Sequence, residues 1–160
     1  MALEVLYLIR HSTAEESHPR GDRHRRLTPD GLVWIDQLAT EAAQRDFRVE
    51  LAVSSPYVRA VQTRDRLFPS ALPIARCEVG LYSPSGYTDD ALDDLESREG
   101  EGFTRIALVT HNPFVTLLAE RLLVPGSIPD LVFSAPSILA LGFDGGLKAR
   151  EGRPLWMLSR

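Results

Sequence analysis

The chain has 160 residues and a mass of 17.8 kDa, with 44% hydrophobic and 25% charged residues, which predicts one globular domain spanning residues 1–160. Its formal net charge is −4 and its pI about 5.6, so it lacks the overall positive charge typical of proteins that bind nucleic acid or anionic membranes. The apolar runs are shorter than the ~20 residues of a membrane-spanning helix, and the first residues do not form a secretory signal, so we expect a soluble cytoplasmic protein.

Apolar runs of strand length alternate along the first half of the chain with segments whose apolar residues recur at helical spacing. In chain order the predicted elements are a strand at Leu3–Ile9, a polar loop at 12–27, a helix from Thr28-Pro29 with Leu32, Ile35, Leu38, Ala39 and Ala42 on its apolar face, a strand at Leu51–Val53, a helix at Tyr57–Phe68 and a strand at Ile74–Val79. The first helix is predicted to start at Thr28-Pro29, because threonine caps free amides and proline fits the first helical turn. The single cysteine, Cys77, falls in the third strand, where we expect a small buried hydrophobic residue.

The alternation continues through the second half of the chain. The predicted elements there are a turn at Ser83–Gly86, an acidic helix at Thr88–Ser97, a strand at Ile106–Val109, a helix opened by Asn112-Pro113 with Phe114, Val115, Leu117, Leu118 and Leu122 on its core face, and strands at Ile138–Phe143 and Leu155–Leu158 joined by a turn at Asp144-Gly145-Gly146. Strands that alternate with helices predict an α/β sheet with helices on both faces. Ligands of such sheets bind beyond the carboxyl ends of the strands.

Three polar segments follow predicted strands directly and are therefore candidate functional sites. These are Arg10-His11, Ser55-Pro56 with Arg59, and Thr110-His111. A guanidinium group matches phosphate oxygens and keeps its charge, and two of them neutralise a phosphoryl dianion without a metal. Histidine is the side chain best suited to be a neutral nucleophile at pH 7, and nearby cations lower its pKa. A second histidine can donate a hydrogen bond to the oxygens of the transferring phosphoryl group.

Other classes of phosphoryl-transfer protein are excluded by missing motifs. The chain has no G-x-x-x-x-G-K-[ST] loop and no D-x-D motif. Cys77 is followed six residues later by Ser83 and not by the arginine of a cysteine-phosphatase loop. A single cysteine also excludes an internal disulfide framework and a cysteine-rich zinc site, and no metal site is expected from His18 and His24.

Four segments, in the right order, resemble the short branch of the histidine phosphatase (phosphoglycerate mutase-like) superfamily. Residues 8–11 resemble its R-H-G signature, and residues 22–31 its D-x-x-R-x-L-T-x-x-G stretch. Residues 54–63 are similar to S-S-P-x-x-R-A-x-Q-T, and residues 109–113 to the H-N-P form of the second catalytic histidine. Within the superfamily the chain looks most like the SixA-type phosphohistidine phosphatases. The resemblance implies a three-layer α/β/α sandwich with a mostly parallel central sheet.

The resemblance also implies a role for each matching residue. His11 would be the nucleophile that forms a covalent phosphohistidine, Arg10 and Arg59 would hold the phosphoryl oxygens, and His111 would stabilise the transition state. Arg25 would add a secondary phosphate contact. Water would then hydrolyse the intermediate and release inorganic phosphate, and no metal or organic cofactor is implied.

Two positions depart from the family pattern. Ser12 stands where the family usually has glycine after the nucleophile, so it either shifts the loop or adds a hydroxyl contact to the phosphate. Gly80 stands where many members have a catalytic glutamate, and the nearby acids are Glu78, Asp89 and Asp90. An imidazole leaving group needs a proton donor less than an alkoxide does, so the departure favours phosphohistidine in a protein partner as substrate.

Alternatives to this hypothesis are left open by the sequence. One is a phosphatase of small phosphate esters from the same superfamily, with a mutase less favoured, and the other is a module that binds phosphorylated partners without turnover. An acid near the pocket would favour the ester phosphatase, and an open, shallow pocket would favour a protein substrate. A basic stretch in the 12–27 loop is either solvated or a rim that attracts acidic substrates: His18, Arg20, Arg23, His24, Arg25 and Arg26.

Overall fold

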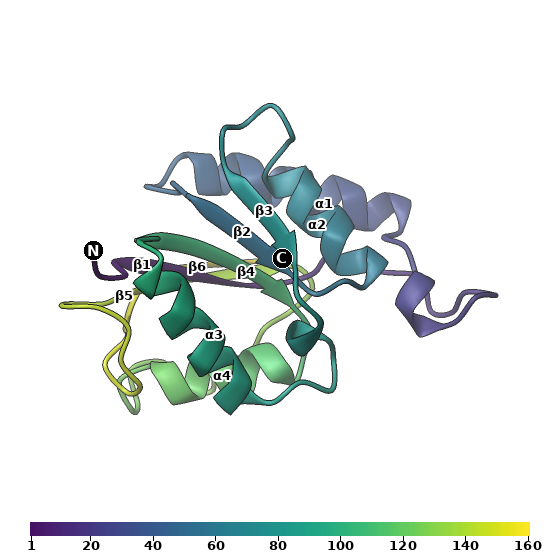
Figure 1. Cartoon of the computed structure of the whole chain (residues 1–160). Helices are drawn as coiled ribbons and strands as arrows, with labels where there is room; N and C mark the ends of the chain where they lie inside the picture. Colours follow the sequence, from purple (N-terminus) through teal and green to yellow (C-terminus); the bar gives the residue numbers. More distant parts are fainter.

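A six-stranded sheet with the strand order β3-β2-β4-β1-β5-β6 forms the centre of the computed structural model, which describes residues 1–160 (Figure 1). The strands are β1 (Val5–Arg10), β2 (Leu51–Ser54), β3 (Ala75–Glu78), β4 (Arg105–Thr110), β5 (Ser137–Gly142) and β6 (Arg153–Ser159). The neighbours β1–β4, β2–β4 and β2–β3 are parallel, whereas β1–β5 and β5–β6 are antiparallel. The predicted mostly parallel sheet is therefore confirmed. That residues 1–160 form a single domain stays a prediction.

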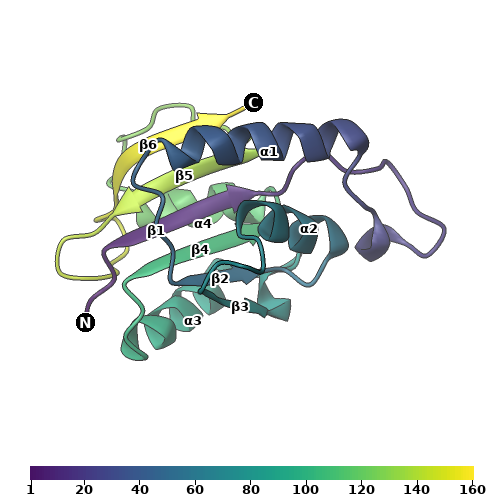
Figure 2. The ribbon, with the colours of Figure 1, turned by 90° about the horizontal axis from the view of Figure 1, so that it is seen from above.

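Helices cover both faces of the sheet. They are α1 (Pro29–Ala43), α2 (Val58–Leu67), α3 (Thr88–Gly100) and α4 (Phe114–Leu122), with short 3-10 turns η1 (Asp22–His24) and η2 (Gly80–Tyr82). Figures 1 and 2 show α1 and α2 on one face and α3 and α4 on the other, which confirms the three-layer α/β/α arrangement. No helix combines the length and the apolar character that crossing a membrane requires.

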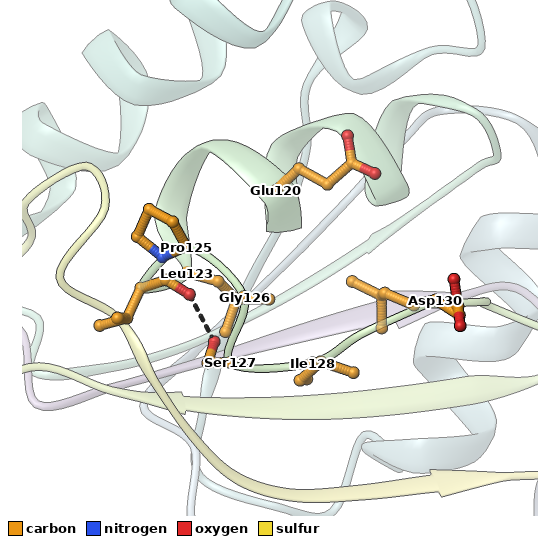
Figure 3. A pocket seen from close by; sticks show the side chains of 9 residues that line it. Glu120, Leu123, Pro125, Gly126, Ser127, Ile128 and Asp130 are labelled. Atoms are coloured by element: carbon orange, nitrogen blue, oxygen red, sulfur yellow. Dashed lines mark hydrogen bonds between the residues drawn. The ribbon is translucent and has the colours of Figure 1, made fainter.

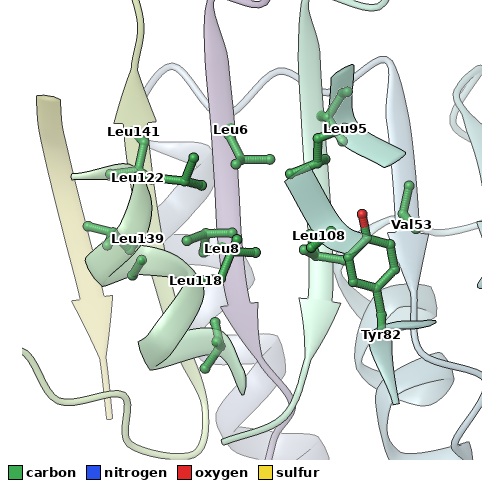
Figure 4. Packing of buried hydrophobic residues seen from close by; sticks show 14 of the residues in the cluster. Leu6, Leu8, Val53, Tyr82, Leu95, Leu108, Leu118, Leu122, Leu139 and Leu141 are labelled. Atoms are coloured by element: carbon green, nitrogen blue, oxygen red, sulfur yellow. The ribbon is translucent and has the colours of Figure 1, made fainter. Parts of the chain in front are cut away.

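The side chains of the central strands alternate between two apolar cores. Leu6 and Leu8 of β1 point into the core beneath α3 and α4, which Figure 4 shows, while Tyr7 and Ile9 point into the core beneath α1 and α2. All four side chains are fully buried. A parallel strand covered on both faces must be apolar on both faces, which explains the nearly continuous apolar run of β1.

The structure confirms the predicted start of α1 and corrects two details of burial. The side-chain oxygen of Thr28 accepts a hydrogen bond from the amide of Gly31 at 2.9 Å, as expected of a cap. Leu117 is 50% exposed, so its predicted place in the core face of α4 is wrong. Cys77 is only half-buried, because β3 is the edge strand of the sheet. Pro113 is the N-cap of α4 and its carbonyl accepts from the amide of Leu117 at 3.0 Å, so the prediction that Asn112-Pro113 opens this helix is confirmed.

Candidate active site

Three neighbouring parallel strands end at one edge of the sheet, and their next residues hold the candidate histidines (Figure 2). His11 follows β1 and His111 follows β4. The backbone amide of His11 donates to the carbonyl of Thr110 at 3.2 Å, and that of Ser55 donates to the carbonyl of Val109 at 3.0 Å. Strand pairing thus continues past the strand ends and brings the rings of His11 and His111 to a centroid distance of 5.0 Å.

The hydrogen bonds of His11 define its reactive nitrogen. Its Nδ1 lies 2.7 Å from the carbonyl oxygen of Ser12, and because a carbonyl only accepts, Nδ1 carries the proton. Nε2 therefore holds a lone pair in the neutral ring, and Nε of Arg59 donates to it at 3.3 Å. Burial, with the positive charges of Arg59 and Arg10 nearby, lowers the pKa of His11 to about 3. The ring is neutral at pH 7, and its unprotonated nitrogen is Nε2, whose lone pair accepts from Arg59.

His111 has one nitrogen that is anchored and one that is free. Its Nε2 lies 2.8 Å from Oγ of Ser55, which also accepts from the amide of Tyr57 at 3.1 Å. When the Ser55 hydroxyl donates its proton to Nε2, Nδ1 of His111 carries a proton of its own. That Nδ1 is buried and has no partner in the protein. Burial lowers the pKa of His111 to about 2, so this ring is also neutral at pH 7.

Three predicted phosphate-binding arginines surround the histidines. Arg59, in the first turn of α2, is 5% exposed and donates from Nη1 to the carbonyl of Asp22 at 2.9 Å. Arg10, the last residue of β1, donates from Nη1 to the carbonyl of Phe133 at 2.7 Å, and its buried Nε has no partner. Arg25 donates from Nη1 to Oδ1 of Asp22 at 2.8 Å. The unpartnered Nε of Arg10 is a donor that a phosphoryl oxygen could satisfy.

Ser12 is hydrogen-bonded within the protein, and its secondary contact with phosphate stays a prediction. Its hydroxyl donates to the carbonyl of Gly31 at 2.6 Å, so the proton is committed to the start of α1. Its amide donates to Oγ1 of Thr63 at 3.0 Å, and that hydroxyl donates to the carbonyl of Arg59 at 2.8 Å. Ser12 and Thr63 thus link the loop that holds the His11 ring to the turn that carries Arg59.

The acids near the expected glutamate position do not contact the histidines. Gly80, Glu78, Asp89 and Asp90 are all exposed, and Asp89 pairs with Arg121 on the outer surface. The structure brings a different acid, Asp22, against Arg59 and Arg25. No cluster of three or more histidine, cysteine or acidic side chains has an arrangement that could hold a metal ion.

The histidines and Arg59 lie beneath the surface. His11 is 8% and His111 2% exposed, and none of the molecule's three cavities is lined by either residue. Figure 3 shows one of these cavities, of about 410 Å³, beyond the carboxyl end of α4 between Leu123 and Leu131. Its lining includes two acids and no basic side chain, so it offers no guanidinium to a phosphate.

Several residues of the sequence motifs shape the site in ways that the sequence did not predict. Ser55 anchors His111, Thr63 joins two loops, and Asp22 engages two arginines. Asn112 shares the carbonyl of Phe133 with Arg10 through its side-chain amide at 3.0 Å. The available signal was their place in the motifs: Ser55 and Thr63 lie in residues 54–63, Asn112 in 109–113 and Asp22 in 22–31.

Comparison with known proteins finds a partial match to one protein family. The model of the histidine phosphatase superfamily (branch 1) matches residues 6–75, which is less than half of the chain but includes His11, Arg25 and Arg59. This match and the structural relatives confirm the resemblance to the histidine phosphatase superfamily. A comparison with curated proteins finds no match.

Among solved structures, the chain is similar to proteins of the SixA type. The protein histidine phosphatase SixA complexed with tungstate has a TM-score of 0.84 at 24% identity, with 97% of this chain and 96% of that chain covered. A SixA protein from Agrobacterium tumefaciens has a TM-score of 0.83 at 22% identity, with 98% of each chain covered. The α-ribazole phosphatase of Shigella flexneri is less similar, with a TM-score of 0.66 at 16% identity over 98% of this chain and 100% of that chain.

Proposed function

We propose that the protein is a metal-independent phosphatase that forms a covalent phosphohistidine on His11 and hydrolyses phosphohistidine in a partner protein. The observation that carries the proposal is the state of the His11 ring. Nδ1 donates to the carbonyl of Ser12, and the unprotonated Nε2 accepts a 3.3 Å hydrogen bond from Nε of Arg59. A buried neutral imidazole beside cations is suited to attack an anionic phosphoryl group.

In the first step, Nε2 of His11 forms a bond to phosphorus while the bond to the leaving nitrogen or oxygen breaks. The guanidinium groups of Arg59 and Arg10 neutralise the negative charge of the phosphoryl oxygens. They supply the positive charge that a metal ion would otherwise supply. The unpartnered Nδ1 of His111, when protonated, donates a hydrogen bond to the phosphoryl group as negative charge develops. In the second step, water attacks phosphorus, the bond to Nε2 breaks, and inorganic phosphate leaves.

The protonation states favour phosphohistidine over an ester. Both histidines are neutral at pH 7, and the two guanidinium groups beside Asp22 lower the pKa of its carboxyl, so it is ionised. No contacting group therefore holds a proton suited to an alkoxide leaving group, whereas an imidazole needs less assistance. The similarity to SixA, a protein histidine phosphatase, supports the same substrate class.

A phosphatase of small phosphate esters is the second candidate, and the burial of the site favours it. His11 and His111 are less than one-tenth exposed, which suits a small substrate better than a side chain on a protein surface. The similarity to the α-ribazole phosphatase of Shigella flexneri, although lower, is in the same direction. The cytoplasmic location expected from the sequence stays a prediction for either candidate.

Phosphate release distinguishes these functions. The assay offers a phosphohistidine-bearing protein and p-nitrophenyl phosphate, each with EDTA, to the wild type and to the His11→Ala variant. The proposal predicts turnover of phosphohistidine that EDTA leaves unchanged and His11→Ala abolishes. Turnover of p-nitrophenyl phosphate alone would favour the ester phosphatase. Phosphate binding without turnover of either substrate would refute catalysis and leave a phospho-binding module.

A further inference from the structure

A carboxylate lies over the arginines of the candidate site. Oδ1 of Asp22 lies 2.8 Å from Nη1 of Arg25, and Oδ2 lies 3.3 Å from Nη2 of Arg59. The carbonyl of Asp22 accepts from Nη1 of Arg59 at 2.9 Å. The adjacent Arg23 guanidinium lies 6.0 Å from the ring centroid of Tyr57. The turn η1 is therefore fastened to the start of α2 by backbone, carboxylate and aromatic contacts.

These contacts use one N–H on each of the three guanidinium nitrogens of Arg59. Its Nε donates to His11, its Nη1 to the Asp22 carbonyl and its Nη2 to the Asp22 carboxylate. A carboxylate and a phosphoryl group present similar pairs of oxygens to a guanidinium. A phosphoryl group bonded to Nε2 of His11 needs Arg59 donors for its own oxygens. Asp22 and the phosphoryl group therefore compete for the same arginine.

The carboxylate of Asp22 can separate from Arg59 at a small cost in solvation free energy. Its side chain is 56% exposed, whereas that of Arg59 is 6% exposed. When the carboxylate swings outward it regains water, and Arg59 keeps an anionic partner in the arriving phosphoryl group. Repulsion between the ionised carboxylate and a phosphoryl dianion acts in the same direction.

We propose that Asp22 is a selectivity residue that pairs with the phosphoryl-binding arginines and is displaced from them by the substrate's phosphoryl group. This inference rests on the proposed function, because it takes Arg59 and Arg25 to bind phosphoryl oxygens. Inorganic phosphate has no further contacts with which to displace the carboxylate, so it binds weakly. A phosphorylated partner that also contacts the rim of the site offsets the competition, and the return of Asp22 assists release of the phosphate product.

The test is the affinity for inorganic phosphate, measured by isothermal titration calorimetry at constant ionic strength. Asp22→Asn removes the charge while keeping the size of the side chain. The matched control is Asp36→Asn, because Asp36 forms a similar two-point pair with Arg66 on the surface, with Oδ2 2.6 Å from Nη2. We expect Asp22→Asn to tighten phosphate binding by about tenfold or more, with the control unchanged. Asp22→Ala, which also removes the hydrogen-bonding oxygens, should change affinity in the same direction.

Kinetics supply a second readout on the same variants. Asp22→Asn should lower KM for p-nitrophenyl phosphate or phosphohistidine and should not raise kcat, since the residue acts on entry and release of the phosphoryl group. Folded Asp22 variants that bind phosphate no more tightly than the wild type would overturn the inference and show that Asp22 positions the arginines. If the wild-type protein in that case still binds phosphate and releases it from the substrate, the proposed function stands. Absence of both phosphate binding and substrate turnover in every variant would overturn both.

Discussion

The pKa of His11 predicts how the stability of the protein changes with pH. In the folded state the pKa is about 3, whereas an unperturbed histidine has a pKa of about 6.5. Between these values the unfolded chain binds a proton at this position and the folded chain does not. Stability is therefore present above about pH 6.5 and is lost as pH falls below it.

The size of this loss follows from the same two values. Each unit of pH below the unfolded pKa costs about 1.4 kcal/mol, so lowering pH from 7.5 to 5.0 removes about 2 kcal/mol of unfolding free energy through His11 alone. The perturbation is His11→Gln, which cannot take up the proton. The matched control is His18→Gln in the surface loop, where the ring of His18 accepts from the amide of Arg20 and lies 6.0 Å from the ring of His24.

Urea unfolding of the three proteins at pH 7.5 and pH 5.0 measures the effect. The wild type and His18→Gln should lose about 2 kcal/mol more than His11→Gln over this interval. His111, whose pKa is also lowered, adds to the loss in all three proteins and cancels in the comparison. An equal loss in the wild type and His11→Gln would refute the reasoning, because His11 would then be charged or accessible to protons in the folded state.

Further predictions concern packing and catalysis. Gly31→Ala should destabilise the fold by about 2–3 kcal/mol in thermal or urea unfolding, because its Cβ would lie 2.2 Å from the carbonyl oxygen of Thr13. Gly100→Ala in α3 meets no atom within 4 Å and should be neutral or stabilising, so equal effects would contradict the packing account. Arg59→Lys should lower kcat/KM about 100-fold, since an ammonium cannot reproduce the guanidinium contacts; activity near that of the wild type would remove Arg59 from the mechanism. Ser55→Ala should lower kcat about tenfold with little change in KM, because Ser55 orients His111; a change in KM alone would instead indicate a role in binding.

The fold was predictable because each element has a strong local signal. The apolar run before Arg10 requires a strand covered on both faces, and Thr28-Pro29 fixes the start of α1. Once parallel strands are adjacent, their carboxyl ends share an edge, and this brings His11 and His111 together from positions 100 residues apart in the sequence.

Edge and face assignments were less predictable. Cys77 lies in an apolar run, but its exposure depends on β3 being the edge strand, which is a property of strand order and not of local sequence. Leu117 follows the helical spacing of α4 but lies at the side of the apolar face, where the protein leaves it 50% exposed. The exposure of such residues depends on tertiary packing, which the periodicity of the sequence does not describe.

The contacts of the 12–27 loop were beyond sequence reasoning for a different reason. The motif at residues 22–31 identified Arg25, but the carboxylate of Asp22 reaches Arg59 only because η1 folds back over α2. Likewise, the sequence predicts either a shifted loop or a phosphate contact for Ser12, and the bond from its hydroxyl to the carbonyl of Gly31 depends on how the loop lies against α1. Loop conformation, and not residue type, determines both outcomes.

The central claim is that the phosphoryl group passes through Nε2 of His11. Its most direct test is to mix enzyme with phosphohistidine-bearing protein, quench in alkali, which preserves phosphohistidine, and locate the phosphoryl group by peptide mass spectrometry. The account predicts one phosphoryl group on His11 in the wild type and none in His11→Asn. Turnover by the wild type with no phosphorylated His11, or with the group on another residue, would contradict it.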